Sequence, residues 1–79
     1  MMITYYAGAA DAAGTTSADL DAGPLTATEV IQRLGAGNPQ LSAVLTHCSL
    51  LVDGRTVGDP SEVIGSAARV DVLPPFAGG

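Results

Sequence analysis

One clearly marked helix, with strand-like segments before and after it, is the feature that most constrains this fold. The sequence T-A-T-E, which begins at Thr26, is a capping box with Thr26 as the N-cap and Glu29 at N3. Val30, Ile31 and Leu34 then share one face at helical spacing. Two glycines follow and end the helix. A single good helix among strands predicts an α+β fold, a mixed five-stranded sheet covered on one face by helix.

Two segments before this helix have the character of strands. Residues 2–7, M-I-T-Y-Y-A, combine β-branched and aromatic side chains. Residues 15–21, T-T-S-A-D-L-D, are a weaker candidate for the return arm of a hairpin. Between them, the small residues from Gly8 to Gly14 are expected to form a loop or a short helical turn.

A second short helix is expected directly after the first. Asn38 is a suitable N-cap, and Pro39 suits the first helical position. Its apolar stripe consists of Leu41, Val44, Leu45 and Cys48. Residues 49–52 then predict a strand, Asp53-Gly54 predicts a tight hairpin turn, and the return begins at Thr56.

The last part of the chain predicts a turn and a final strand. Residues 59–62 are expected to open a turn or a short helix, with Val63 and Ile64 as its apolar anchor. Residues 68–73, A-R-V-D-V-L, alternate in polarity as a half-buried strand does. This alternation places Val70 and Val72 on one face and Leu73 on the other. Two prolines end the strand, because proline cannot donate a hydrogen bond to a ladder.

Length and composition limit the class of protein. A chain of 79 residues, 47% apolar and only 14% charged, suits one small domain and not a disordered segment. We expect residues 1–75 to form this domain and residues 76–79 to form a flexible tail. No window reaches the roughly 18 apolar residues of a membrane span, and the N-terminus lacks the pattern of a signal peptide. We therefore expect a cytoplasmic protein without membrane contact.

The charge of the chain also excludes several functions. Eight acidic residues face three basic ones, all arginine, for a net charge of −5. This balance argues against nucleic acid and favours a partner protein with a basic surface. The chain has no lysine, which excludes a phosphate-binding loop of the GxxxxGK type and a lysine Schiff base.

One cysteine and one histidine leave little room for other chemistry. Cys48 cannot form a disulfide within the chain, and these two residues cannot complete a four-ligand zinc site, so no metal is expected. Neighbouring positions on a helix point about 100° apart, so His47 does not face Cys48 as a catalytic base would. We interpret Cys48 as a small buried apolar residue and His47 as a surface residue.

The last six residues, P-P-F-A-G-G, are an unusual ending for a small domain. Two prolines stiffen the exit from the last strand, and only Phe76 is bulky after them. Four residues reach up to about 14 Å when extended. Two glycines would allow a partner's backbone to close around the tail and receive the terminal carboxylate in a narrow site.

These segments together resemble the MoaD-type sulfur carriers, the small subunits of molybdopterin synthase within the MoaD/ThiS ubiquitin-like family. The resemblance covers essentially the whole chain: the first strand, the helix from Thr26 to Leu34, the hairpin sequence L-L-V-D-G, and the ending V-D-V-L-P-P-F-A-G-G, which is the most specific part. It implies a ubiquitin-like β-grasp fold. It also implies that this chain is a sulfur-donor subunit without an active site of its own.

The resemblance assigns the reacting group to Gly79. A MoeB-like enzyme would adenylate its carboxylate with ATP, and a sulfurtransferase would convert it to a thiocarboxylate. The sulfur would pass to cyclic pyranopterin monophosphate on a MoaE-type large subunit, in a heterotetramer. The chain itself would bind no cofactor. The implied partner-binding residues are Leu73, Pro74, Pro75, Phe76, Ala77 and Gly78.

Three alternatives remain open from the sequence. A sulfur carrier for thiamine or cysteine biosynthesis would share the fold and the Gly-Gly end. A ubiquitin-like modifier would share the chemistry up to adenylation and would then be joined to lysines of other proteins. A plain interaction domain would have an inert tail, and deleting Gly78 and Gly79 would then cost no activity.

Overall fold

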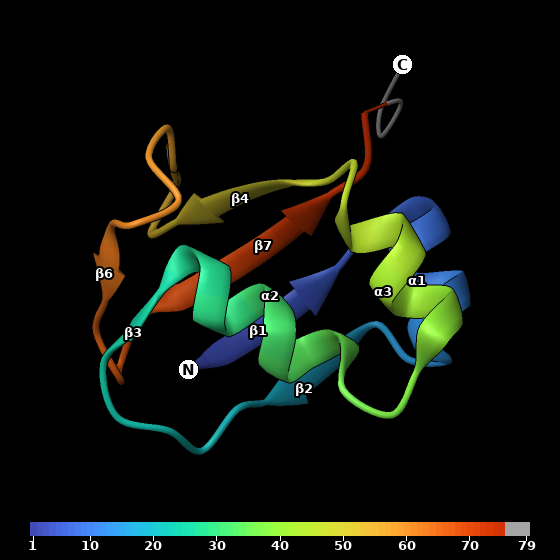
Figure 1. The fold of residues 1–79 in the computed structure, drawn as a ribbon, viewed down its shortest axis with the longest axis horizontal. Helices are drawn as coiled ribbons and strands as arrows, with labels where there is room; N and C mark the ends of the chain where they lie inside the picture. Colours follow the sequence, from blue (N-terminus) through green and yellow to red (C-terminus); the bar gives the residue numbers. More distant parts are fainter. Residues whose placement is uncertain (76–79) are drawn as a thin grey trace.

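The structure is a computed structural model that describes residues 1–75 of the chain. Strands and helices follow one another closely along it (Figure 1). In chain order they are β1 (Met2–Tyr5), α1 (Ala7–Ala13), β2 (Ser17–Asp19), β3 (Leu25–Thr26), α2 (Ala27–Gly35), α3 (Pro39–Leu45), β4 (Ser49–Val52), β5 (Arg55–Thr56), β6 (Val63–Ile64) and β7 (Arg69–Leu73).

The main sheet has five strands in the order β2-β1-β7-β4-β5. The two central neighbours β1 and β7 run parallel, and the other pairs are antiparallel. The three helices lie on one side of this mixed sheet, with α2 crossing over β1 and β7 (Figure 1). The arrangement is the β-grasp fold that the sequence predicted.

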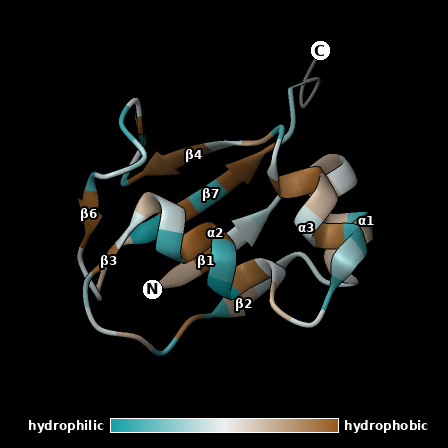
Figure 2. Cartoon of the chain, in the orientation of Figure 1, coloured by the Kyte–Doolittle hydropathy of each residue, from teal (hydrophilic) through white to brown (hydrophobic). Residues whose placement is uncertain are grey.

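The core lies between the helices and one face of the sheet. Apolar colour covers β4 and β6, alternates with hydrophilic colour along β7, and occurs on parts of α2 and α3 (Figure 2). Alternate residues of the central strands point inward, and the largest fully buried side chains are Ile3, Val30, Leu45, Ile64, Val70 and Val72. The face of the main sheet that points away from the helices is called the outer face below.

The capping box of α2 is formed as the sequence predicted. The Thr26 hydroxyl accepts a hydrogen bond from the Glu29 backbone N–H at 3.2 Å, and the Glu29 carboxylate accepts one from the Thr26 N–H at 2.9 Å. The hydrogen bond from the Thr26 backbone N–H, and after it the Thr26 side chain, lower the pKa of the Glu29 carboxyl below its ordinary value. The two bonds also satisfy two backbone donors at the start of the helix, which lies across the sheet.

Replacing Thr26 with alanine is expected to lower the free energy of unfolding by about 1 kcal/mol, because the Glu29 N–H loses its acceptor. Urea unfolding of the wild type and the variant measures this difference. Gln32→Ala serves as the control, because Gln32 is an exposed residue of the same helix. Equal stability of wild type and Thr26→Ala would show that the cap contributes nothing.

The structure corrects the interpretation of the small-residue stretch near the N-terminus. Residues 7–13 form a helix, α1, which begins at Ala7 with a positive φ of 48°, and not a loop or a single turn. Gly14 ends it in the left-handed conformation, at φ 75°, which glycine adopts without strain. The Asn38 side chain, which caps α3, also donates a hydrogen bond to the Ala12 carbonyl at 3.1 Å. A contact from a distant residue therefore supports a helix that has no strong signal of its own.

Two further expectations were wrong in detail. Residues 59–62 form the expected turn, in which the Glu62 N–H donates a hydrogen bond to the Asp59 carbonyl at 3.0 Å. Val63 and Ile64 do not anchor this turn but form β6, which pairs with β3 in a separate two-stranded sheet with Leu25 opposite Ile64. The second helix ends at Leu45, so Cys48 lies beyond it. The predicted hairpin turn is confirmed, because Asp53 and Gly54 both have positive φ, as a tight turn of this type requires.

Residues 1–75 contain neither a membrane-spanning helix nor a metal-binding cluster. Among residues 1–75, no helix has the length and apolar character needed to cross a membrane. In the same residues, no three side chains among His, Cys, Asp and Glu are grouped in a way that would hold a metal ion.

Candidate functional site: the end of β7 and the outer face

The candidate site begins where β7 ends, because this strand leads into the tail. β7 lies between β1 and β4 in the main sheet. At its end, Leu73 pairs with Ser49 and Val72 pairs with Leu50. The Val72 carbonyl also accepts a hydrogen bond from the Tyr6 N–H at 3.2 Å. The tail therefore starts from a strand held on both sides.

Pro74 and Pro75 determine how the chain leaves the sheet. Neither has a backbone N–H, so the ladder between β7 and β4 cannot continue through them. Pro74 is partly buried, and Pro75 is exposed. Of the predicted site residues, the structure thus describes Leu73, Pro74 and Pro75 in sequence at one end of the sheet. The others, Phe76, Ala77, Gly78 and Gly79, lie outside the described residues.

Leu73 lies on the outer face. It alternates with the fully buried Val72 and is itself partly exposed. The predicted face of Leu73 is therefore confirmed. Leu51 of β4 lies on the same face, because it is partly exposed between two buried neighbours and pairs with Asp71. An apolar surface thus lies beside the start of the tail.

The sequence analysis did not predict two further apolar residues on this face. Met2 is 50% exposed and Tyr6 is 42% exposed. Both alternate with the buried Ile3 and Tyr5 along the first strand, so the same argument that placed Leu73 would have placed them. Tyr6 lies next to the end of β7 through its backbone bond to Val72.

The outer face is also hollowed and charged. A hollow of about 590 Å³ is lined by Met2, Thr4, Tyr6, Asp53, Gly54, Arg69 and Asp71. Its walls carry two carboxylates and one guanidinium. Asp53 accepts a hydrogen bond from the Arg69 backbone N–H at 3.0 Å, which ties the β4–β5 turn to the start of β7. The hollow therefore has a fixed wall and a net acidic lining.

Cys48 lies on the other side of the sheet and has no features of a reactive thiol. Its Sγ donates a hydrogen bond to the Val44 carbonyl at 3.3 Å. Partial burial raises the pKa of the Cys48 thiol above its ordinary value, whereas an activated cysteine has a lowered one. Cys48 borders a groove of about 180 Å³ beside α2. The thiol is therefore a packing group, as the sequence indicated.

Solved structures with the same fold include proteins of archaea. SAMP1 from Haloferax volcanii has a TM-score of 0.81 at 24% sequence identity, over 100% of this chain and 98% of that one. A second structure, of H. volcanii small archaeal modifier protein 1, has a TM-score of 0.81 at 22% identity, over 96% and 97%. A putative molybdopterin converting factor, subunit 1, from Pyrococcus furiosus has a TM-score of 0.76 at 19% identity, over 95% of both chains.

These structural matches have low sequence identity and show the β-grasp fold alone. A search of curated proteins gave no match. A comparison with protein families gave one that covers nearly all of the sequence: the model of the ThiS family matches residues 3–79, from β1 through the Gly-Gly end. The chain therefore belongs to the ThiS family.

Proposed function

We propose that this chain carries sulfur as a thiocarboxylate on Gly79 and donates it as the small subunit of molybdopterin synthase. The observation that carries this proposal is the ending of the chain. The family match includes Gly79, and the tail follows directly from a central strand of the sheet. The likeness to a putative molybdopterin converting factor subunit supports the choice of acceptor.

The chemistry requires only a deliverable carboxylate from this chain. The Gly79 carboxylate attacks the α-phosphorus of ATP, pyrophosphate leaves, and an acyl adenylate forms. A persulfide of a sulfurtransferase then attacks the carbonyl carbon and displaces AMP. A further thiol cleaves the sulfur–sulfur bond, which leaves the thiocarboxylate on Gly79. ATP and the catalytic groups belong to the activating enzyme and the sulfurtransferase.

The receiving partner is a MoaE-type large subunit, which takes up the tail and binds cyclic pyranopterin monophosphate. In a heterotetramer, two carriers would supply the two sulfur atoms of one dithiolene. The net charge of −5 suits a basic partner surface. The apolar residues beside the start of the tail suit the centre of such an interface. We assign this docking role to Leu73, together with Leu51 and Tyr6 on the outer face.

Replacing Leu73 with aspartate is expected to weaken binding to the large subunit by about 30-fold, because a central apolar contact is worth about 2 kcal/mol. Isothermal titration calorimetry with the purified large subunit measures this loss. The matched control is Val63→Asp, which adds the same charge at a residue that is 64% exposed and lies on β6. The control should bind as the wild type does.

The stability of Leu73→Asp must be measured beside its affinity. We expect little change in its urea unfolding midpoint, because Leu73 is only partly buried. If the variant unfolds, Leu73 belongs to the core and the docking role is wrong. If the variant is stable and binds normally, the interface lies elsewhere.

Intact-mass spectrometry tests the main proposal directly. The purified chain is incubated with ATP, a sulfur source and host lysate, and its mass is compared before and after. We expect a mass increase equal to the exchange of one oxygen for sulfur, mapped to Gly79. Copurification of the large subunit would then identify the acceptor pathway. An unchanged mass, in a lysate that converts known sulfur carriers, would rule the proposal out.

A protein-modifier function is the second candidate. It is favoured by the two SAMP1 structures, one of them named small archaeal modifier protein 1, whose TM-scores of 0.81 exceed the 0.76 of the converting factor subunit. In this function a lysine amine of another protein attacks the acyl adenylate, AMP leaves, and an isopeptide bond forms. Trypsin cleaves after Arg69, so a modified lysine would carry residues 70–79 as a remnant that mass spectrometry detects. Absence of this remnant from active lysate would exclude the modifier function.

A further inference from the structure

Asp71 is a partly buried carboxylate in the middle of the outer face. Of the eight acidic residues, only Asp71 and Glu62 are partly buried, and the other six are exposed. The Glu62 carboxylate is bound by the Arg55 guanidinium. Within residues 1–75, by contrast, no group donates a hydrogen bond to the Asp71 carboxylate or forms an ion pair with it. Asp71 is therefore the one partly buried acidic residue without a counter-group in that part of the chain.

The neighbours of Asp71 on the sheet do not supply a positive charge. Asp71 pairs with Thr4 of β1 on one side and with Leu51 of β4 on the other. Both neighbours lie on the outer face with it, and neither is charged. Removing water from a carboxylate without a donor in its place costs free energy. A cationic group that reaches this carboxylate from outside the chain would recover that cost.

The hollow of about 590 Å³ on the outer face gives such a group access to Asp71. Thr4 and Tyr6 line the hollow together with Asp71, and Tyr6 is 42% exposed. A carboxylate accepts two parallel N–H bonds from a guanidinium, and the planar face of a guanidinium stacks on an aromatic ring. A carboxylate beside an exposed tyrosine therefore suits an arginine side chain better than a lysine.

Arg69 determines which end of the hollow a cation can occupy. It lies two residues before Asp71 on β7, about 7 Å along the strand, and lines the same hollow. Asp53 lies at the Arg69 end, because its carboxylate accepts a hydrogen bond from the Arg69 backbone N–H at 3.0 Å. The Arg69 guanidinium repels a second cation. An incoming cation is consequently directed to the end with Asp71, Thr4 and Tyr6.

The Asp71 end of the hollow lies next to the docking residues. Leu73 follows Asp71 by two positions on the outer face, about 7 Å along β7, and Leu51 pairs with Asp71 directly. A basic side chain over Asp71 would thus be flanked by the apolar contacts assigned above to the interface. On a partner strand, an arginine and an apolar residue two positions apart have the matching spacing.

We propose that Asp71 receives an arginine side chain of the large subunit, and that this ion pair selects the partner and fixes its orientation on the outer face. The identity of the partner rests on the proposed function, whereas the preference for a guanidinium rests on the hollow itself. Apolar contacts at Leu73 and Leu51 give little direction, but a charge pair beside them favours one register. A partner with an acidic or apolar side chain at this place would cover the Asp71 carboxylate without a donor, and its binding is disfavoured.

Binding of a small guanidinium compound tests the hollow without any partner protein. The isotope-labelled chain is titrated with N-acetylarginine amide and, in parallel, with the neutral isostere N-acetylcitrulline amide, and the backbone amide resonances are followed by NMR. We expect the arginine compound to shift the resonances of Thr4 and Asp71 in a saturable way. The citrulline compound should bind more weakly by about fivefold or more, because it lacks the charge that the carboxylate requires.

Two substitutions that each remove one carboxylate give the matched comparison. Asp71→Asn acts inside the hollow, and Asp11→Asn acts at an exposed residue of α1, on the helix side of the sheet. Asp71→Asn should abolish the saturable shifts, and Asp11→Asn should retain them. Both variants should keep the urea midpoint of the wild type, because neither carboxylate forms an ion pair within residues 1–75. Arg69→Gln should bind the arginine compound about twofold more tightly, because a repelling charge is removed.

The purified large subunit then tests the selection of the partner. Isothermal titration calorimetry at low and at high salt compares the wild type with Asp71→Asn and Asp11→Asn. Asp71→Asn should bind about tenfold more weakly at low salt and should depend less on salt than the wild type, because the lost contact is an ion pair. Asp11→Asn should bind as the wild type does.

The outcomes separate this inference from the proposed function. Shifts that are no larger at Thr4 and Asp71 than elsewhere, or that persist in Asp71→Asn, would overturn the inference even where Gly79 gains sulfur. Unchanged binding of Asp71→Asn to the large subunit would overturn it as well. A chain that binds the arginine compound in the hollow but neither binds the large subunit nor gains sulfur would overturn the proposed function, and with it the identity of the partner, while the preference for a guanidinium would stand.

Discussion

A chain that lacks Gly79 is expected to acquire no sulfur under conditions that convert the full-length chain. Deletion of this residue moves the terminal carboxylate back by about 3.5 Å, the length of one extended residue. Even a 1 Å misplacement of a reacting group lowers rates by about a hundredfold. A carboxylate that stops short of the ATP site should therefore lose at least this factor, as measured by intact-mass spectrometry over time.

Two companion variants make this experiment specific. A chain with one glycine added after Gly79 displaces the carboxylate in the other direction and should be equally inactive. Gly23→Ala should react as the wild type does, because a Cβ at Gly23 meets no atom within 4 Å. The described core lies before the tail, so all three variants should share the urea midpoint of the wild type. Conversion of the truncated chain at the wild-type rate would show that Gly79 does not carry the reacting group.

The parts of the fold that the sequence predicted depend on short-range interactions. The capping box of α2 joins residues three positions apart, and the hairpin turn at Asp53 and Gly54 depends on two adjacent conformations. Alternation along β7 placed Val70, Val72 and Leu73 on the correct faces, because one side of the sheet is covered by helices. In each case the sequence itself contains the interacting groups or their spacing.

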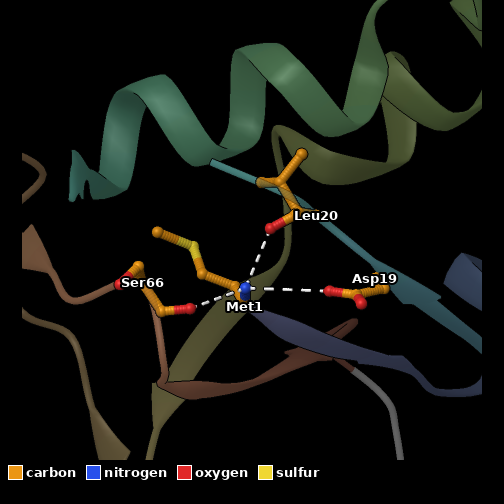
Figure 3. A network of polar contacts seen from close by, with 4 residues as sticks. All are labelled: Met1, Asp19, Leu20 and Ser66. Carbon is orange, nitrogen blue, oxygen red and sulfur yellow. Dashed lines mark hydrogen bonds and ion pairs between the residues drawn. The ribbon is translucent and has the colours of Figure 1, made fainter. Parts of the chain in front are cut away.

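The elements that were missed depend on distant contacts. β3 and β6 are each two residues long, and their pairing joins Leu25 to Ile64 across 39 positions of sequence. α1 has no polar cap, and its last turn is bonded by Asn38 from another helix. The hydrogen bond of 2.8 Å from the Met1 nitrogen to the Ser66 carbonyl likewise joins distant parts of the chain (Figure 3). No local pattern encodes these contacts.

Part of the candidate site was predictable because it, too, depends on local patterns in the sequence. Leu73 and the two prolines after it were recognisable from alternation and from their missing N–H groups. Met2 and Tyr6 were equally recognisable, but their role depends on the position of β1 beside β7, which the sequence does not state. The roles of Phe76, Ala77, Gly78 and Gly79 remain predictions from the motif.

Replacing Ile3 with alanine is expected to cause a large loss of stability. Ile3 is fully buried and pairs with Val70 on one side and Ala18 on the other. Removing three carbon atoms from such a site costs about 2–5 kcal/mol, because the cavity that remains closes only partly. A domain of 79 residues has a total stability of about 4–12 kcal/mol. Urea unfolding followed by circular dichroism should therefore show a large fall in the midpoint.

Met2→Ala is the control for Ile3→Ala. Met2 precedes Ile3 in the same strand but is 50% exposed on the outer face, so a difference in stability between the two variants reports burial and not the position in β1. The free energy of unfolding of Met2→Ala should stay within about 0.5 kcal/mol of the wild type. The parallel pairing of β1 with β7 also holds the strand that leads into the tail. Ile3→Ala should consequently lose thiocarboxylate formation as the temperature approaches its lowered midpoint, whereas Met2→Ala should retain it. Equal destabilisation by the two substitutions would mean that the two faces of β1 are assigned wrongly, and the outer face would lose its claim to be the docking surface.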